Sequence, residues 1–175
     1  TITHNILQTA FPMLVAQVLN LLYSIVDRVY IGRIPGAGTE ALGAVGLCFP
    51  VIILVTGFTN MFGLGGAPLF SMALGQGNRE KAIDIQNTAL RLLVLVGAAI
   101  LLVGELLGDR ILLLFGATTG ELSLALPYLR IYLVGTIFIM VSTGMNAYIN
   151  AQGFPVVGMI SVTIGAASNL ILDPL

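Results

Sequence analysis

The sequence predicts an all-α integral membrane protein. It is 57% hydrophobic and only 9% charged, whereas about 25% of the residues in a soluble domain are charged. Three tracts contain no Asp, Glu, Lys or Arg, namely residues 1–26, 41–78 and 131–172. Because about 20 apolar residues cross the hydrocarbon core of a bilayer as a helix, each tract is long enough for at least one crossing.

Turn-forming residues divide the chain into about five crossings. The first helix is expected at 6–31, before a Gly/Pro cluster at 32–38 that is typical of a turn. The second is expected at 42–74 and contains Pro50 and the run Gly63-Leu64-Gly65-Gly66. Such helix breakers are tolerated in membranes when neighbouring groups or water satisfy the freed backbone groups, so we expect this helix to be bent.

The remaining crossings follow from the next polar segments. The third helix, expected at 89–107, comes after the most polar stretch of the chain, which must be an aqueous loop. The fourth, at 126–147, would be opened by Pro127. Turn residues at 150–155 split the last uncharged tract and leave a fifth helix at 156–174.

Composition excludes several classes of function. The net charge of -1 and the dispersed cations do not form a nucleic-acid surface. The chain has one histidine, His4, one lysine, Lys81, and one cysteine, Cys48, and it lacks the HExxH and GxxxxGK[ST] motifs. We therefore expect neither an enzyme nor a resident cofactor.

The first helix carries one polar stripe. At 100° per residue, four polar side chains project within about 80° of Asp27: Gln17, Asn20, Tyr23 and Ser24. A carboxylate at the centre of a membrane helix costs roughly 2.5–3.5 kcal/mol on insertion scales, so such a stripe faces a bundle interior or a water-filled cavity. The alternatives are interhelical hydrogen bonds that join the bundle, or a local pair between Asp27 and Arg28.

The fifth helix carries a second polar pair. Asn169 and Asp173 are four residues apart and share a helix face, and Pro174 cannot donate to the carbonyl of Leu170. This oxygen-rich setting suits a small hard cation or a proton-dependent kink; alternatively, Asp173-Pro174 ends the helix at the interface. Spans one and five run in the same direction, so Asp27 and Asp173 lie at similar depth and share a cavity if their helices are neighbours.

Five segments, taken in order along the whole chain, carry a resemblance to a known family. They are Pro12, Asp27-Arg28-Val29-Tyr30-Ile31-Gly32-Arg33, Ala41-Leu42-Gly43-Ala44-Val45-Gly46 with Pro50, Tyr128-Leu129-Arg130-Ile131, and Asn169-Leu170-Ile171-Leu172-Asp173-Pro174-Leu175. Together they resemble the multidrug and toxic compound extrusion (MATE) family. That resemblance implies two six-helix lobes around a central cleft, of which residues 1–175 would be an incomplete N-terminal lobe.

The Asn-x-x-x-Asp pair is similar to the DinF-like branch of this family. The resemblance implies that Asp27, Asn169 and Asp173 are the coupling residues for a proton or Na+, with a cytoplasmic amino terminus. It implies a multi-pass protein of the cell (inner) membrane whose partners are the bilayer, small organic cations or amphipathic drugs, and the rest of its own chain, meaning helix six and the C-lobe.

The implied function is cation-coupled antiport by alternating access. A lipid-linked oligosaccharide flippase of the same superfamily is the nearest alternative, and it would need several arginines in the cleft. An intramembrane enzyme would need a nucleophile or metal set, and a structural subunit would carry no substrate-dependent cation flux.

Overall fold

The computed structural model describes residues 2–172. The described chain contains helices and no strands. The helices are α1 (Ile2–Gly32), α2 (Gly38–Phe62), α3 (Ala67–Gly75), α4 (Arg79–Leu114), α5 (Thr119–Ala151) and α6 (Pro155–Leu172). With α2 and α3 taken together, five helices of the described chain are long and apolar enough to cross a membrane. The predicted all-α membrane class is confirmed.

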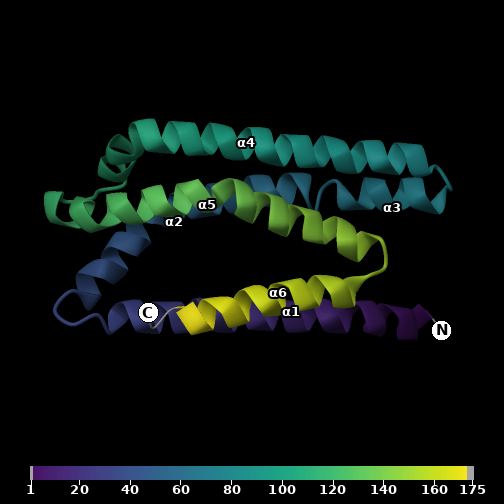
Figure 1. Ribbon diagram of the computed structural model, residues 1–175, viewed down its shortest axis with the longest axis horizontal. Coiled ribbons are helices and arrows are strands. Elements are labelled where there is room, and N and C mark those ends of the chain that lie inside the picture. The colour runs from purple at the N-terminus through teal and green to yellow at the C-terminus, as the bar shows by residue number, and fades with distance from the viewer. Residues whose placement is uncertain (1, 173–175) are drawn as a thin grey trace.

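The helices form two groups, α1 with α6 and α4 with α2, α3 and α5 (Figure 1). Helices α1 and α6 lie side by side and run in the same direction, while α4 lies on the far side of the molecule with α2 and α5 in between. Helix α5 is central, because it packs against α2, α3, α4 and α6. Spans one and five are therefore neighbours, as a shared cavity requires.

Two helices extend well beyond the predicted crossings. Helix α4 has 36 residues and α5 has 33, whereas crossings of 89–107 and 126–147 were expected. Pro127 lies inside α5 rather than at its start, because Thr118 and Glu121 form a capping box that begins the helix eight residues earlier. At 1.5 Å per residue α4 is about 54 Å long, so its ends project beyond the roughly 30 Å hydrocarbon core.

A glycine with positive φ lies in each of four turns. Gly36, Gly77, Gly116 and Gly153 adopt φ values between 74° and 92°, a region that favours glycine because it has no Cβ. They follow α1, α3, α4 and α5. Gly36 and Gly153 lie in the segments 32–38 and 150–155 that the sequence marked as turns.

The second predicted span is broken rather than bent. Residues 63–66 separate α2 from α3, and the Gly65 N–H donates to the Asn60 carbonyl, five residues back. The Tyr148 hydroxyl of α5 donates to the Phe62 carbonyl over 2.9 Å, and its ring meets Phe70 edge-on. A side chain from another helix thus satisfies a carbonyl at the break.

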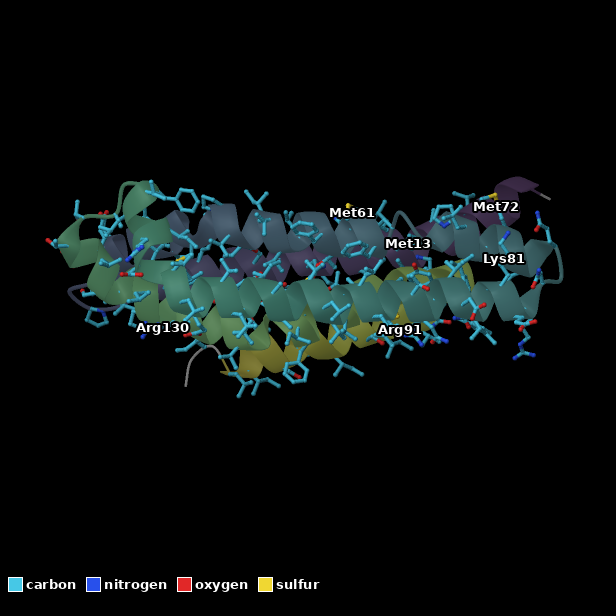
Figure 2. The ribbon with its side chains drawn as sticks, turned by 90° about the horizontal axis from the view of Figure 1, so that it is seen from above. Met13, Met61, Met72, Lys81, Arg91 and Arg130 are labelled. Atoms are coloured by element: carbon cyan, nitrogen blue, oxygen red, sulfur yellow. The ribbon has the colours of Figure 1, made fainter. Side chains whose placement is uncertain are left out.

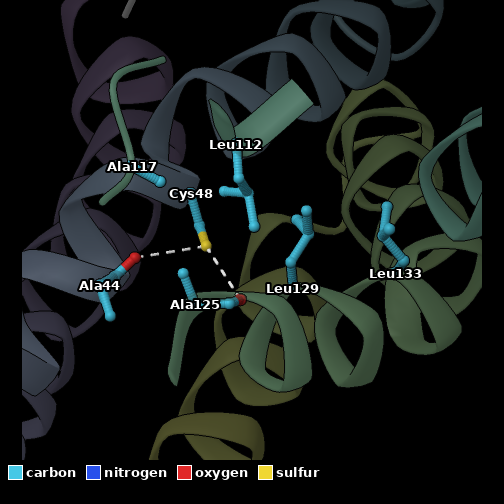
Figure 3. Close-up of a cluster of buried hydrophobic side chains, with 7 residues drawn as sticks. All are labelled: Ala44, Cys48, Leu112, Ala117, Ala125, Leu129 and Leu133. Atoms are coloured by element: carbon cyan, nitrogen blue, oxygen red, sulfur yellow. Dashed lines mark hydrogen bonds between the residues drawn. The ribbon is translucent and has the colours of Figure 1, made fainter. Parts of the chain in front are cut away.

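The core lies between α2, α4 and α5. Figure 3 shows one buried cluster, in which the Cys48 sulfhydryl points to the carbonyls of Ala44 and Ala125, 3.4 and 3.6 Å away. Gly104 is buried, and a Cβ there would collide with Leu133 of α5. The Gly104–Gly108 spacing therefore serves close helix packing, which is the commonest use of small residues in membranes.

Candidate functional site

A cleft of about 790 Å³ opens between α1, α2, α5 and α6. Apolar and polar side chains both line it, and its described lining contains no Asp, Glu, Lys, Arg or His. The polar lining residues come from all four helices: Gln17, Asn20, Tyr23, Thr59, Asn60, Ser142, Thr143, Asn146, Asn150, Ser161 and Asn169. A hollow of this size and mixed character suits an amphipathic molecule.

The polar stripe of α1 lies only partly in this cleft. Gln17, Asn20 and Tyr23 line it, whereas Ser24 and Asp27 do not belong to its lining. Both of these residues are half-buried. The stripe therefore leads from the cleft along α1 towards the end of the helix that carries Asp27.

Asp27 interacts electrostatically with one aromatic hydroxyl group of α5. Its carboxylate is within electrostatic range of the Tyr128 hydroxyl, and the Tyr23 hydroxyl is similarly near that of Tyr132. The guanidinium of Arg28 lies over the Phe49 ring of α2, 4.8 Å from its centroid, which is a cation–π contact. The neighbouring charges of Asp27 and Arg28 thus face different helices, α5 and α2 respectively.

One of the predicted partner residues, Asn169, lies on α6. Asn169 lines the cleft, and α6 packs along α1 in the parallel sense (Figure 1). Asp173 and Pro174 lie outside the described residues, so the role of Asp173 stays a prediction. The structure thus brings Asn169 to the same hollow as Gln17, Asn20 and Tyr23.

Two further polar residues meet at the contact between α5 and α6. The Asn146 amide donates to the Gly158 carbonyl over 3.4 Å, while the Oδ1 atoms of Asn146 and Asn150 are buried and accept no hydrogen bond from the described part of the chain. A Cβ at Gly158 would collide with both oxygens. The sequence did not single out this pair, although the Asn-x-x-x-Asn spacing in an uncharged tract is the same signal that marked Asn169 and Asp173.

Comparison with known proteins identifies relatives along almost the whole chain. The MatE family profile matches residues 12–175. The multidrug export protein MepA of Staphylococcus aureus (strain MRSA252) is 25% identical over 166 residues, which cover 95% of this chain and 36% of that protein. The chain therefore spans little more than a third of the length of this curated relative.

Solved structures share the fold. A crystal structure of MATE in complex with MaD3S has a TM-score of 0.90 and 26% identity, with coverage of 97% of this chain and 38% of the other. A MOP superfamily transporter from Pyrococcus furiosus Vc1 has a TM-score of 0.88 and 26% identity, with coverage of 97% and 37%. Both matches extend over the helices that form the cleft.

Proposed function

The chain belongs to the MatE family, and from this premise we propose that it forms part of a cation-coupled exporter of amphipathic organic compounds. Its relatives include a multidrug export protein. We infer that the substrates are small organic cations or amphipathic drugs and that the protein is a multi-pass transporter of the cell membrane rather than an enzyme. The remainder of the transporter would complete the cleft.

The cleft is the observation that carries this proposal. Its volume of about 790 Å³ lies within the 300–1,000 Å³ of small-molecule sites. Apolar side chains such as Met13 and Phe138 share its lining with the amides of Asn20 and Asn60. Polar groups at membrane depth are costly unless they face a cavity or a partner, so a substrate pathway accounts for their presence in four different helices.

We propose Asp27, Asn169 and Asp173 as the coupling residues. Carboxylate and amide oxygens are suitable ligands for Na+, and either carboxylate can instead take a proton. Neutralising Asp27 by either ion would lower the cost of holding it in the membrane. In the described chain the backbone of α1 lies close only to the backbones of α2 and α6, and Asp27 reaches the Tyr128 hydroxyl of α5. A charge change at Asp27 would therefore shift α1 and α6 relative to α2 and α5.

This shift would couple the ion to the substrate through alternating access. The cleft would alternate between a state open to one side of the membrane and a state open to the other. The ion stabilises one state and the substrate stabilises the other, because each binds the two states with different affinity. The ion and the substrate are therefore transported in opposite directions. The described cleft lining contains no arginine or lysine. A flippase for charged lipid-linked oligosaccharides, which would need several arginines there, is therefore not supported.

The test measures drug efflux by the full-length protein in proteoliposomes under separate sodium and proton gradients. We expect Asp27→Asn and Asp173→Asn each to abolish gradient-driven efflux without loss of membrane insertion, since neither amide can exchange a charge. Asp109→Asn is the matched control, because Asp109 is an exposed acid near the C-terminal end of α4 and does not line the cleft. Retained efflux in both variants would refute the coupling role, and the gradient that drives the wild type identifies the ion.

A further inference from the structure

A second hollow lies on another face of the molecule, where α2, α3 and α4 meet. This groove has a volume of about 430 Å³ and is lined mainly by apolar side chains. Glycines at the α2–α3 break, Gly65 and Gly66, contribute backbone instead of side chains, so the break itself creates room. The Tyr148 ring closes the groove from the direction of α5.

The outward side of the groove faces the surroundings of the bundle. Met61, Leu69 and Leu92 line it and are 55%, 53% and 37% exposed. In a membrane-spanning bundle such exposed apolar side chains contact lipid. The groove is therefore open to a molecule that arrives from the bilayer.

Two opposite charges stand at one end of the groove. Lys81 and Asp84 both line it, both are exposed, and they lie three residues apart on the first turns of α4. Figure 2 shows Lys81 near the end of the molecule where α3 meets α4, with Met61 further towards the middle. No ion pair joins Lys81 to Asp84 in the described chain.

The groove extends along α4 from its polar end into the predicted crossing. Lys81 and Leu92 are eleven residues apart on α4, which corresponds to about 16 Å along a helix at 1.5 Å per residue. A molecule whose headgroup lies at Lys81 and Asp84, at the polar end of α4, would thus extend as far as Leu92, which lies within the crossing predicted at 89–107.

We propose that this groove binds a phospholipid with a zwitterionic, primary-ammonium headgroup. Its phosphate would be held by the Lys81 ammonium, its own ammonium would donate to the Asp84 carboxylate, and one acyl chain would lie along Met61, Leu69 and Leu92. A cation and an anion on one helix face complement such a headgroup, whereas an anionic lipid would be repelled by Asp84. This site is separate from the cleft and does not depend on the proposed transport function.

Lipid retention by the full-length protein tests the proposal. The protein is equilibrated in nanodiscs with equal amounts of phosphatidylethanolamine, phosphatidylcholine and phosphatidylglycerol, and the lipids that stay bound after detergent extraction are counted by native mass spectrometry. We expect phosphatidylethanolamine to be retained preferentially. Lys81→Gln should reduce its retention by about fivefold, the equivalent of about 1 kcal/mol for one interfacial cation, and Asp84→Asn should remove the preference over phosphatidylglycerol.

Matched controls distinguish the loss of this lipid site from a general change in surface charge and from misfolding. Arg79→Gln and Glu80→Gln change exposed charges in the same turn of α4 that do not line the groove, and both should retain lipid as the wild type does. Thr88→Trp places a large ring in the groove from an exposed position and should abolish retention while helicity is kept. Equal retention of the three lipids, unchanged retention in Lys81→Gln and Asp84→Asn, or equal losses in the controls would each overturn the proposal.

Discussion

Gly158 determines how closely α5 and α6 approach at the wall of the cleft. Its missing side chain leaves room for the amide oxygens of Asn146 and Asn150, while its carbonyl accepts the Asn146 amide. Asn146 and Asn150 are four residues apart and therefore lie on one face of α5. A single glycine on α6 thus sets the positions of two polar groups that line the cleft.

We predict that Gly158→Ala destabilises the protein by about 1–3 kcal/mol, the usual cost of overpacking a close contact. The added methyl group would collide with both amide oxygens. Thermal unfolding of the purified full-length protein measures the effect. Gly165→Ala on the same helix is the control, because a Cβ there meets nothing within 4 Å; it should be neutral or stabilising by up to about 1 kcal/mol through helix propensity. Equal melting temperatures for the two variants would contradict this account.

Among the elements, the broken span α2–α3 is the most unusual. The glycines of residues 63–66 interrupt the helix, and residues on either side of the break line two separate hollows: Gly63 and Leu64 face the cleft, while Gly65 and Gly66 face the groove near Lys81. An interrupted helix is tolerated in a membrane when its backbone groups find partners elsewhere. Here Tyr148 of α5 supplies one of them.

We predict that Tyr148→Phe destabilises the protein by about 1 kcal/mol. The variant keeps the ring against Phe70 but leaves the Phe62 carbonyl without its 2.9 Å donor, and interhelical hydrogen bonds in membrane proteins average about 0.6 kcal/mol with a maximum near 1.7. Chemical denaturation in detergent measures the change. Tyr30→Phe, at a residue that is 41% exposed, serves as the control and should have little effect on stability. If Tyr30→Phe lowers the free energy of unfolding as much as Tyr148→Phe does, the hydrogen bond at the break does not account for the change.

Across the whole molecule, the outer faces and the cleft have opposite character. The outward positions of α4, such as Leu102 and Leu106, are apolar and 63% and 77% exposed, as lipid contact requires. The cleft between α1, α2, α5 and α6 carries hydroxyl and amide groups. This division follows from the cost of placing polar groups against hydrocarbon.

We predict that the cleft is accessible to water in the full-length protein within its membrane. In a background from which the native cysteines, Cys48 among them, have been replaced by alanine, Ser142→Cys should react quickly with a membrane-impermeant maleimide because Ser142 lines the cleft. Leu102 is also exposed, but it lies on the outer face of α4 in apolar surroundings, so Leu102→Cys should react slowly. Similar rates at both positions would contradict a water-filled cleft.

The sequence predicted the crossings better than it predicted the ends of the helices or the contacts between them. Hydropathy predicted the number and order of the crossings, because charges are so costly in hydrocarbon that the uncharged tracts mark the spans. It did not predict where α4 and α5 begin, since those ends lie outside the hydrocarbon and depend on caps such as Asn78 and Thr118. Of the proposed coupling residues, Asn169 lies in the cleft, Asp27 interacts electrostatically with Tyr128, and Asp173 lies outside the described residues. The coupling role of all three stays a prediction.

The sequence by itself determined the class of protein, the five crossings and the parallel course of the first and last of them, because each follows from hydrophobicity and turn residues close together in the chain. Only the tertiary structure decided which polar residues share a cavity. Tyr148 reaches a carbonyl 86 residues away, and Asn146 and Asn150 meet Gly158 from a different helix. Contacts of this kind depend on how neighbouring helices rotate and pack, which short-range patterns along one helix do not specify.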